Sequence, residues 1–279
     1  MIDPELESHY NLQARRDDIA DVLASWNNRS EAARTQLETT LDCEYGSHAR
    51  EKIDFFHCGI ANAPLFVFIH GGYWQRLGKS TFSLIAKPFV KNGVNVALIE
   101  YPLCPEVSMT QLIESIRKAL AWIYRNASQI GFDRDRINLC GHSAGGHLTA
   151  MCLATRWDQF ATDLPVNMIK TGIPFSGLYE LEPLVKTSIG TALNLTENEF
   201  EKCSPINRTA ATEAPILIVV GGAETPAFFT QADDFERSWA DPELKIEQHI
   251  EPGADHFDLV DRLADANSAF FLRIQTWLR

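Results

Sequence analysis

The 279-residue sequence predicts a doubly wound α/β fold, in which a mostly parallel sheet carries helices on both faces and a small cap. From about residue 41 onward, short β-branched runs alternate with longer amphipathic stretches, as expected for successive strands and helices of a parallel sheet. The run Leu65–Ile69 is apolar at every position. Such strands are typical of a sheet that helices cover on both faces.

The expected elements follow in order along the chain. Polar residues dominate the first 40 positions, where apolar residues at helical spacing predict an N-terminal helical extension over 1–40. Strands are expected at Lys52–His57, Leu65–Ile69, Val94–Glu100, Arg136–Cys140, Met168–Pro174, Ile216–Val220 and Lys245–Glu251. Helices are expected at Gly78–Lys91, Met109–Ile130, Ala144–Trp157, Phe228–Ala240 and near Asn267–Leu278. No linker interrupts residues 41–279, which are expected to form a single domain with the cap at about 176–204.

Charge and composition argue against several classes of function. The chain has 25 Lys and Arg against 37 Asp and Glu, and its net charge of −12 disfavours nucleic-acid partners, which need a basic surface. No apolar run approaches the roughly 18–20 residues that span a bilayer, and the first residues lack a secretory signal, so we expect no membrane association. The six cysteines form no C-x-x-C pair, so we expect free thiols and a cytoplasmic location. A homodimer stays possible.

Residues 141–145 read Gly-His-Ser-Ala-Gly between an expected strand and an expected helix. This G-x-S-x-G pattern is typical of a nucleophile elbow, a sharp turn that exposes a serine hydroxyl above the sheet. The flanking positions must be glycine because side chains there would collide with the turn. The pattern lacks the second glycine of a dinucleotide-binding G-x-G-x-x-G turn. We therefore predict that Ser143 is a nucleophile.

Two adjacent glycines follow the apolar strand that ends at Ile69. Their backbone N–H groups can approach a substrate oxygen closely, because no side chain intervenes. We predict that Gly71 and Gly72, together with the N–H of Ala144, form an oxyanion hole for the nucleophile. The preceding His70 is expected to brace this loop by hydrogen bonds rather than to act as an acid or base.

A general base is needed to activate Ser143, and in folds built around this elbow the order along the chain is Ser, then Asp or Glu, then His. Histidines before the elbow therefore come too early. His142 and His147 flank the elbow too closely to fold back onto the serine, and His249 lies inside an expected strand. His256 lies on the loop after that strand, and we predict that it is the base.

The acid that orients the base should follow the strand Ile216–Val220. The loop at this position offers Glu224. Asp233 and Asp234 lie farther along, in the expected helix, and Asp255 adjoins the base itself. Glu224 is the predicted acid, and a nearby aspartate stays the alternative.

The chain carries the stretches HGGYWQ at 70–75, EYPLCPE at 100–106, GHSAGGHL at 141–148 and DHF at 255–257. Together they resemble kynurenine formamidase (arylformamidase), an α/β-hydrolase family related to the hormone-sensitive-lipase esterases, from about residue 45 to the C-terminus. The resemblance implies an α/β-hydrolase fold and hydrolysis of N-formyl-L-kynurenine to kynurenine and formate. It implies the same nucleophile, base and oxyanion donors, with no metal and no organic cofactor. Members of the family usually place Asp where this chain has Glu224.

Aromatic residues beside the expected site suit an aromatic formamide or ester as the small-molecule substrate. Tyr73 and Trp74 adjoin the oxyanion loop and Phe228 follows the acid loop, so we predict that they line the pocket, with ordinary core packing as the alternative for Phe228. Fold and triad do not fix the acyl group, so a short-acyl carboxylesterase or another amidase stays open. A ligand-binding protein that has lost hydrolysis is less consistent with the sequence, because both nucleophile and base are present.

Overall fold

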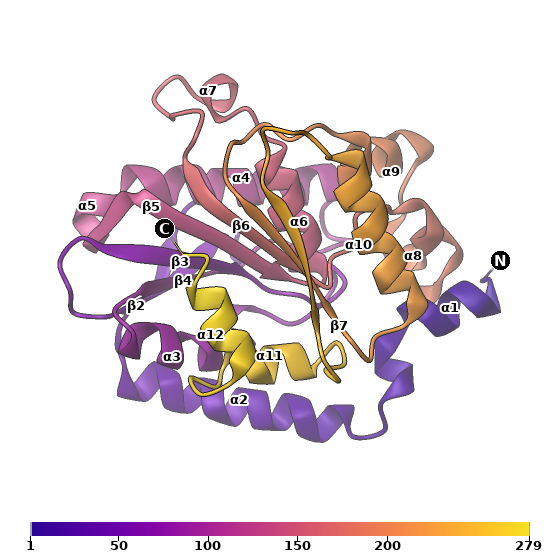
Figure 1. Ribbon diagram of the computed structural model, residues 1–279, viewed down its shortest axis with the longest axis horizontal. Coiled ribbons are helices and arrows are strands. Elements are labelled where there is room, and N and C mark those ends of the chain that lie inside the picture. The colour runs from indigo at the N-terminus through magenta and orange to yellow at the C-terminus, as the bar shows by residue number, and fades with distance from the viewer. Residues whose placement is uncertain (1, 279) are drawn as a thin grey trace.

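An eight-stranded sheet runs through the middle of the computed structural model, which describes residues 2–278 (Figure 1). The strand order is β1-β2-β4-β3-β5-β6-β7-β8. Strand β2 is antiparallel to both of its neighbours, and the remaining pairs are parallel. The strands are β1 Glu38–Glu44, β2 Lys52–His57, β3 Ala63–Ile69, β4 Asn95–Ile99, β5 Phe132–His142, β6 Ile169–Phe175, β7 Ile216–Gly221 and β8 Ile246–Glu251.

Helices cover both faces of this sheet, and the predicted fold class is confirmed. Helices α2, α3, α11 and α12 lie on one face, and α4, α5 and α6 lie on the other (Figure 1). The α-helices are α1 Pro4–Tyr10, α2 Ile19–Gln36, α3 Ala86–Lys91, α4 Met109–Arg125, α5 Ala127–Ile130, α6 Ala144–Leu153, α7 Trp157–Phe160, α8 Ser188–Leu193, α9 Glu197–Cys203, α10 Pro226–Ser238, α11 Asp258–Leu263 and α12 Ala269–Gln275. Short 3₁₀ helices are η1 Leu12–Arg15, η2 Lys79–Ile85, η3 Glu182–Lys186 and η4 Pro205–Asn207. No helix within residues 2–278 is both long and apolar enough to cross a membrane.

Several expected boundaries differ from the structure for local reasons. The helix expected at Met109–Ile130 is divided at Asn126, and its second part ends at Gly131, which has the left-handed φ of 96° that glycine adopts without strain. The expected helix Gly78–Lys91 begins as a 3₁₀ turn. Strand β1 was not expected, because at the edge of the sheet it lacks a clear apolar alternation, and most of its residues are exposed.

The N-terminal residues lie against the segment expected to form the cap. Helices α1 and α2 occupy most of residues 1–40, and η3, α8 and α9 occupy much of 176–204. The backbone N–H of Asp3 donates to the carbonyl of Lys186 at 2.8 Å, and Glu7 accepts hydrogen bonds from the N–H and the hydroxyl of Ser188, both at 2.7 Å. These two segments therefore meet near the start of the chain.

The core is built from the apolar central strands and the helices that pack on them. Residues Leu65 to Ile69 of β3 are all at most 1% exposed. Phe66 stacks on Phe89 of α3 with ring centroids 4.0 Å apart, and Phe89 meets Phe271 of α12 edge-on at 5.0 Å. Because β3, β5, β7 and β8 are parallel, their carboxyl ends lie at one edge of the sheet, where the loops after them converge.

Candidate active site

Ser143 lies on a sharp turn between β5 and α6. Its backbone angles, φ 58° and ψ −119°, are unusual for a residue with a side chain, which is typical of a functional turn. The turn packs so tightly that a Cβ on Gly141 would lie 2.1 Å from the carbonyl oxygen of Gly145. A Cβ on Gly145 would lie 1.9 Å from the carbonyl oxygen of Ile69. Both positions therefore require glycine, and the turn holds the backbone of Ser143 in place.

The loop after β3 approaches the same serine. A Cβ on Gly71 would lie 3.1 Å from the Cβ of Ser143, so the backbone at this position comes close to the side chain of the serine. Gly72 has a φ of 117°, and a Cβ there would lie 2.1 Å from the carbonyl oxygen of Arg76. Ala144 begins α6, where backbone N–H groups have no partner within the helix. The structure thus brings the three predicted oxyanion donors close to the turn that carries Ser143.

His70 fixes this loop from behind. Its Nδ1 lies 2.7 Å from the carbonyl oxygen of Gly71, its Nε2 lies 3.3 Å from Oε1 of Glu100, and its ring stacks on Tyr101 at 4.3 Å. Burial raises the pKa of Glu100, but the hydrogen bond and charge of His70 and the charge of Arg50 together hold the pKa below its usual value. The Glu100 carboxylate therefore serves as a fixed acceptor beneath the loop.

His256 lies on the loop between β8 and α11, and Glu224 lies on the loop after β7. Their side chains meet, with Nδ1 of His256 at 2.9 Å from Oε2 of Glu224. The other carboxylate oxygen of Glu224 accepts from the backbone N–H of Gly221 at 2.9 Å and from the hydroxyl of Ser176. Neither side chain is more than 6% exposed. This pair fixes the orientation of the imidazole and of the carboxylate.

The other carboxylates considered from the sequence contact different groups. Asp255 accepts from Arg16 at 2.8 Å and from the backbone N–H of Phe257 at 2.8 Å. Asp233 accepts from Gln248 at 3.0 Å. Asp234 forms an ion pair with Arg237 at 2.9 Å. Among these candidates, Glu224 is the one that contacts His256.

A second histidine supports the loop of His256, and the sequence did not indicate this role. His142 is buried, its Nε2 lies 3.0 Å from the carbonyl oxygen of His256, and the two rings are 4.4 Å apart. Burial, and then the charge of His256, hold the pKa of His142 well below its usual value. His142 is therefore a neutral donor that ties the end of β5 to the backbone of the candidate base.

Ser143 and His256 line one small cavity of about 20 Å³. Gly71, Gly72, Tyr73 and His142 line it on the side of the oxyanion loop and β5, and Trp26, Leu77, Phe82 and Phe257 also contribute, with Gln13 near the N-terminus. A second cavity, of about 180 Å³, shares His256 and Phe257 with the first. Its other lining residues are Leu12, Arg15, Arg16, Ala223, Glu224, Thr225 and Asp255.

Of the aromatic residues predicted to line the pocket, only Tyr73 does so. Its hydroxyl donates to the carbonyl of Tyr10 at 3.0 Å, which ties the N-terminal segment to the oxyanion loop. Trp74 lines neither of these two cavities; its indole is fully buried and donates to Nδ1 of His147 at 3.2 Å. Phe228 lines neither cavity, since it is 1% exposed and packs against His256 with rings 5.0 Å apart.

Trp26, Phe82 and Phe257 also line the small cavity, although no motif in the sequence connects them with the nucleophile. Trp26 belongs to α2, far from the motifs in the chain, and its ring lies 5.6 Å from Phe82 and 6.3 Å from Phe257. Only tertiary packing brings α2 to this place. The aromatic residues that surround the nucleophile are therefore largely different from those expected.

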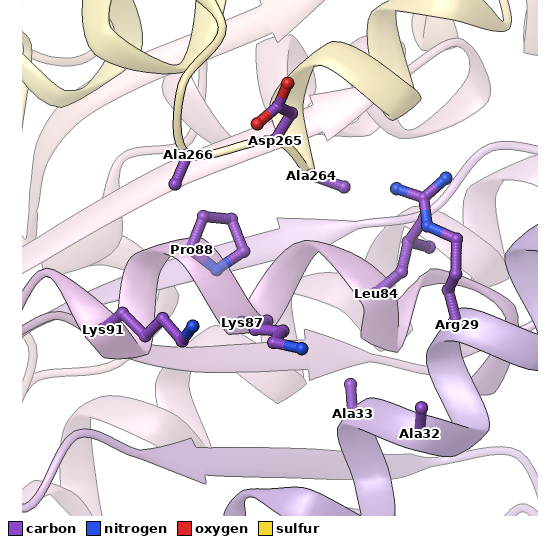
Figure 2. Close-up of a pocket in the computed structure, with 10 residues that line it drawn as sticks. All are labelled: Arg29, Ala32, Ala33, Leu84, Lys87, Pro88, Lys91, Ala264, Asp265 and Ala266. Atoms are coloured by element: carbon purple, nitrogen blue, oxygen red, sulfur yellow. The ribbon is translucent and has the colours of Figure 1, made fainter.

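A larger hollow, of about 390 Å³, lies between α2, α3 and the connection from α11 to α12 (Figure 2). Arg29, Lys87 and Lys91 lie at this hollow with Asp265, and alanines line much of the rest. It contains none of Ser143, Glu224 and His256. Size alone is therefore a poor guide to the reactive site in this molecule. Within residues 2–278, no three His, Cys, Asp or Glu side chains converge so as to hold a metal ion.

Comparison with known proteins identifies relatives across most of the chain. The model of the BD-FAE family matches residues 58–238. Kynurenine formamidase from Salmo salar is 30% identical over 269 residues, which cover 93% of this chain and 89% of that protein. Kynurenine formamidase from Drosophila melanogaster is 30% identical over 255 residues, which cover 87% and 83%.

Solved structures of two hydrolytic enzymes, one of them assigned only provisionally, have a similar fold over most of this chain. A protein from Silicibacter sp. tm1040, described provisionally as a thioesterase, superimposes with a TM-score of 0.84 at 32% identity and covers 97% of this chain and 99% of its own. Esterase B from Lactobacillus rhamnosis shares the fold with a TM-score of 0.71 at 17% identity, covering 92% and 91%. The chain is therefore a hydrolase of the α/β-hydrolase fold that belongs to the BD-FAE family and is related to kynurenine formamidases over most of its length.

Proposed function

We propose that this protein hydrolyses N-formyl-L-kynurenine to kynurenine and formate, with Ser143 as nucleophile, His256 as base and Glu224 as the orienting acid. The observation that carries the proposal is the pairing of His256 with Glu224 at 2.9 Å, on a loop that lines the same cavity as Ser143. Kinship with kynurenine formamidases at 30% identity supports the choice of substrate.

The reaction proceeds in two steps on these residues. Ser143 attacks the formyl carbonyl as Nε2 of His256 takes its proton, and the N–H groups of Gly71, Gly72 and Ala144 stabilise the oxyanion. His256 then gives the proton to the departing aniline nitrogen, and the C–N bond breaks to leave a formyl ester on the serine. Water, deprotonated by His256, attacks this ester; the bond between the acyl carbon and Oγ of Ser143 breaks, His256 returns the proton to Ser143, and formate leaves. The side chain of Glu224 stabilises the imidazolium that forms in each step.

Of the two cavities that His256 lines, the one of about 180 Å³ suits the kynurenine part of the substrate. The leaving nitrogen must lie beside the base that protonates it, and His256 lines this cavity of about 180 Å³. Arg16 is already paired with Asp18, Asp255 and Asp258. Arg15 donates to the carbonyl of Ser8 at 3.1 Å and, within residues 2–278, has no carboxylate at ion-pair distance. Arg15 is thus available to pair with the amino-acid carboxylate of the substrate.

A short-acyl carboxylesterase is the second candidate, because the same nucleophile and oxyanion donors cleave esters as readily as amides. The fold of this chain is similar to that of esterase B, which is compatible with this second candidate. A cytoplasmic location is part of the proposal, and the six cysteines support it, since all are free thiols in the structure.

A substrate panel tests the proposal. The purified protein is given N-formyl-L-kynurenine, N-formylanthranilate and p-nitrophenyl acetate, and both kynurenine and formate are measured for the first. We expect kcat/KM to be highest for N-formyl-L-kynurenine and activity to vanish in Ser143→Ala. Turnover of the acetate ester without release of kynurenine would favour the esterase instead. A matched variant, Arg15→Gln, should raise KM for N-formyl-L-kynurenine and leave the uncharged ester unaffected.

A further inference from the structure

The cavity beside the nucleophile is small, and large apolar side chains form part of its lining. At about 20 Å³, it has room for roughly one water molecule. Trp26 of α2, Leu77 and Phe82 line it together with the candidate catalytic residues Ser143 and His256. The side chains of Trp26, Leu77 and Phe82 have no polar group that takes part in the proposed chemistry, so their role must lie in the shape of the site.

The reaction places the acyl substituent at this cavity. An acyl group bound to Ser143 keeps its carbonyl oxygen at Gly71 and Gly72, which line the same cavity. The leaving group lies toward His256 and the larger cavity, because His256 must protonate it. The remaining substituent of the acyl carbon therefore points into the small cavity. In a formyl group this substituent is a hydrogen atom, whereas each longer acyl chain adds carbons that need space there.

The lining is held in place by contacts outside the cavity. Trp26 is 1% exposed, and its indole N–H donates to Asp261 at 3.1 Å. The same carboxylate pairs with Arg29, one turn farther along α2. Ser30 donates to the carbonyl of Thr81 at 2.8 Å and accepts from a backbone N–H of η2 at 2.9 Å. Movement of Trp26 away from the serine would break several of these contacts, so the cavity resists enlargement.

We propose that Trp26 and Leu77 set the length of the acyl group that this enzyme accepts, so that formyl is favoured and each added carbon is penalised. The inference rests on the proposed function, because it concerns the same nucleophile and the same acyl group. It assigns part of the specificity to the N-terminal helix α2, which carries none of the proposed catalytic groups. One methylene in a tight apolar pocket changes kcat/KM by roughly 10–200-fold, which sets the size of the effect.

The test compares p-nitrophenyl acetate with p-nitrophenyl butyrate as substrates of the 279-residue protein. The butyrate-to-acetate ratio of kcat/KM is measured in wild type, Trp26→Ala and Leu77→Gly. Leu77 has a φ of 66°, so glycine there removes the side chain in a backbone conformation that suits it. Trp157→Ala is the matched control, because Trp157 is also 1% exposed but lines neither cavity.

We expect the wild type to prefer acetate strongly and both cavity variants to raise the ratio by about 10-fold or more, while Trp157→Ala leaves it unchanged. If Trp26→Ala does not fold, Leu77→Gly decides the question alone. An unchanged ratio in a folded cavity variant, or a wild type that accepts butyrate as well as acetate, overturns the inference. Hydrolysis of N-formyl-L-kynurenine is measured separately. A protein that does not hydrolyse it but still prefers acetate to butyrate would contradict the proposed function and leave the inference on acyl length intact.

Discussion

Replacement of Glu224 by glutamine tests how the acid acts on the base. The change keeps the size of the side chain and removes its charge. In the structure, one carboxylate oxygen accepts from the N–H of Gly221 at 2.9 Å, and this group can only donate. The amide oxygen of the glutamine must therefore take that position. Its NH₂ group then faces Nδ1 of His256, where the other carboxylate oxygen lies at 2.9 Å.

This arrangement reverses the tautomer of the base. An NH₂ group at that position donates to Nδ1, so the proton of the neutral imidazole moves to Nε2, the nitrogen that must accept the proton of Ser143. Loss of the correct tautomer in a serine triad lowers kcat by about 10⁴-fold. We expect a loss of about 10²–10⁴-fold in kcat for Glu224→Gln, with KM little changed, because glutamine keeps the size and shape of the side chain in the cavity lining.

Steady-state kinetics on one formyl substrate decides between the candidate acids. Asp255→Asn and Asp233→Asn are the matched controls, since these carboxylates bind Arg16 and Gln248 rather than the base. Both should retain most of their activity. A kcat near that of the wild type in Glu224→Gln, combined with a large loss of kcat in Asp255→Asn, would refute the reasoning and would indicate Asp255 as the acid.

Three further predictions concern the nucleophile, the oxyanion loop and a buried histidine. Ser143→Ala should lower kcat by about 10⁴–10⁶-fold with an unchanged Tm, and a serine-directed phosphonate should label this residue in the wild type. Gly72→Ala should lower kcat by about 10²–10³-fold, because its Cβ would lie 2.1 Å from the carbonyl of Arg76 and displace a donor; equal kcat in a folded variant would argue against the loop. Burial lowers the pKa of His147 to about 4 from 6.5, so the unfolded chain binds more protons below pH 6.5, and the folded state loses stability as the pH falls toward 4. Urea unfolding should show a loss of about 2 kcal/mol between pH 7 and pH 5 from this group, a loss that is absent in His147→Gln and kept in the control His57→Gln.

Much of the fold could be predicted because several strands, β3 above all, contain long apolar runs. Leu65–Ile69 has no polar position, and only a strand with both faces covered tolerates that pattern. Strand β1 could not be found in this way, because at the sheet edge it needs no apolar face. Helix α11 was missed because it is a six-residue helix directly after the loop of His256, too short for a helical period to appear.

The candidate catalytic residues were accessible to sequence reasoning because each follows a strand end. Ser143, Glu224 and His256 come after β5, β7 and β8, and parallel strands bring such loops together at one edge. The pocket residues were less accessible. Trp74 adjoins the oxyanion loop in sequence, yet its φ of 59° belongs to a turn that sends its indole to His147 instead. Adjacency in the chain therefore predicted position along the loop but not the direction of the side chain.

The N-terminal segment shows why the shape of a site is harder to predict than its chemistry. Catalysis constrains residue types, so serine, histidine and glycine leave patterns at fixed spacing. The lining of a cavity requires only a large side chain at a given position, which any apolar helix can supply. Trp26 on α2 lines the cavity, and the hydroxyl of Tyr73 forms hydrogen bonds with the backbone of Tyr10 and Leu12. Residues of the N-terminal segment that belong to no motif therefore contribute to the shape of the site. Among relatives with the same catalytic groups, we therefore expect acyl preference to follow the packing of this segment rather than the sequence of the elbow.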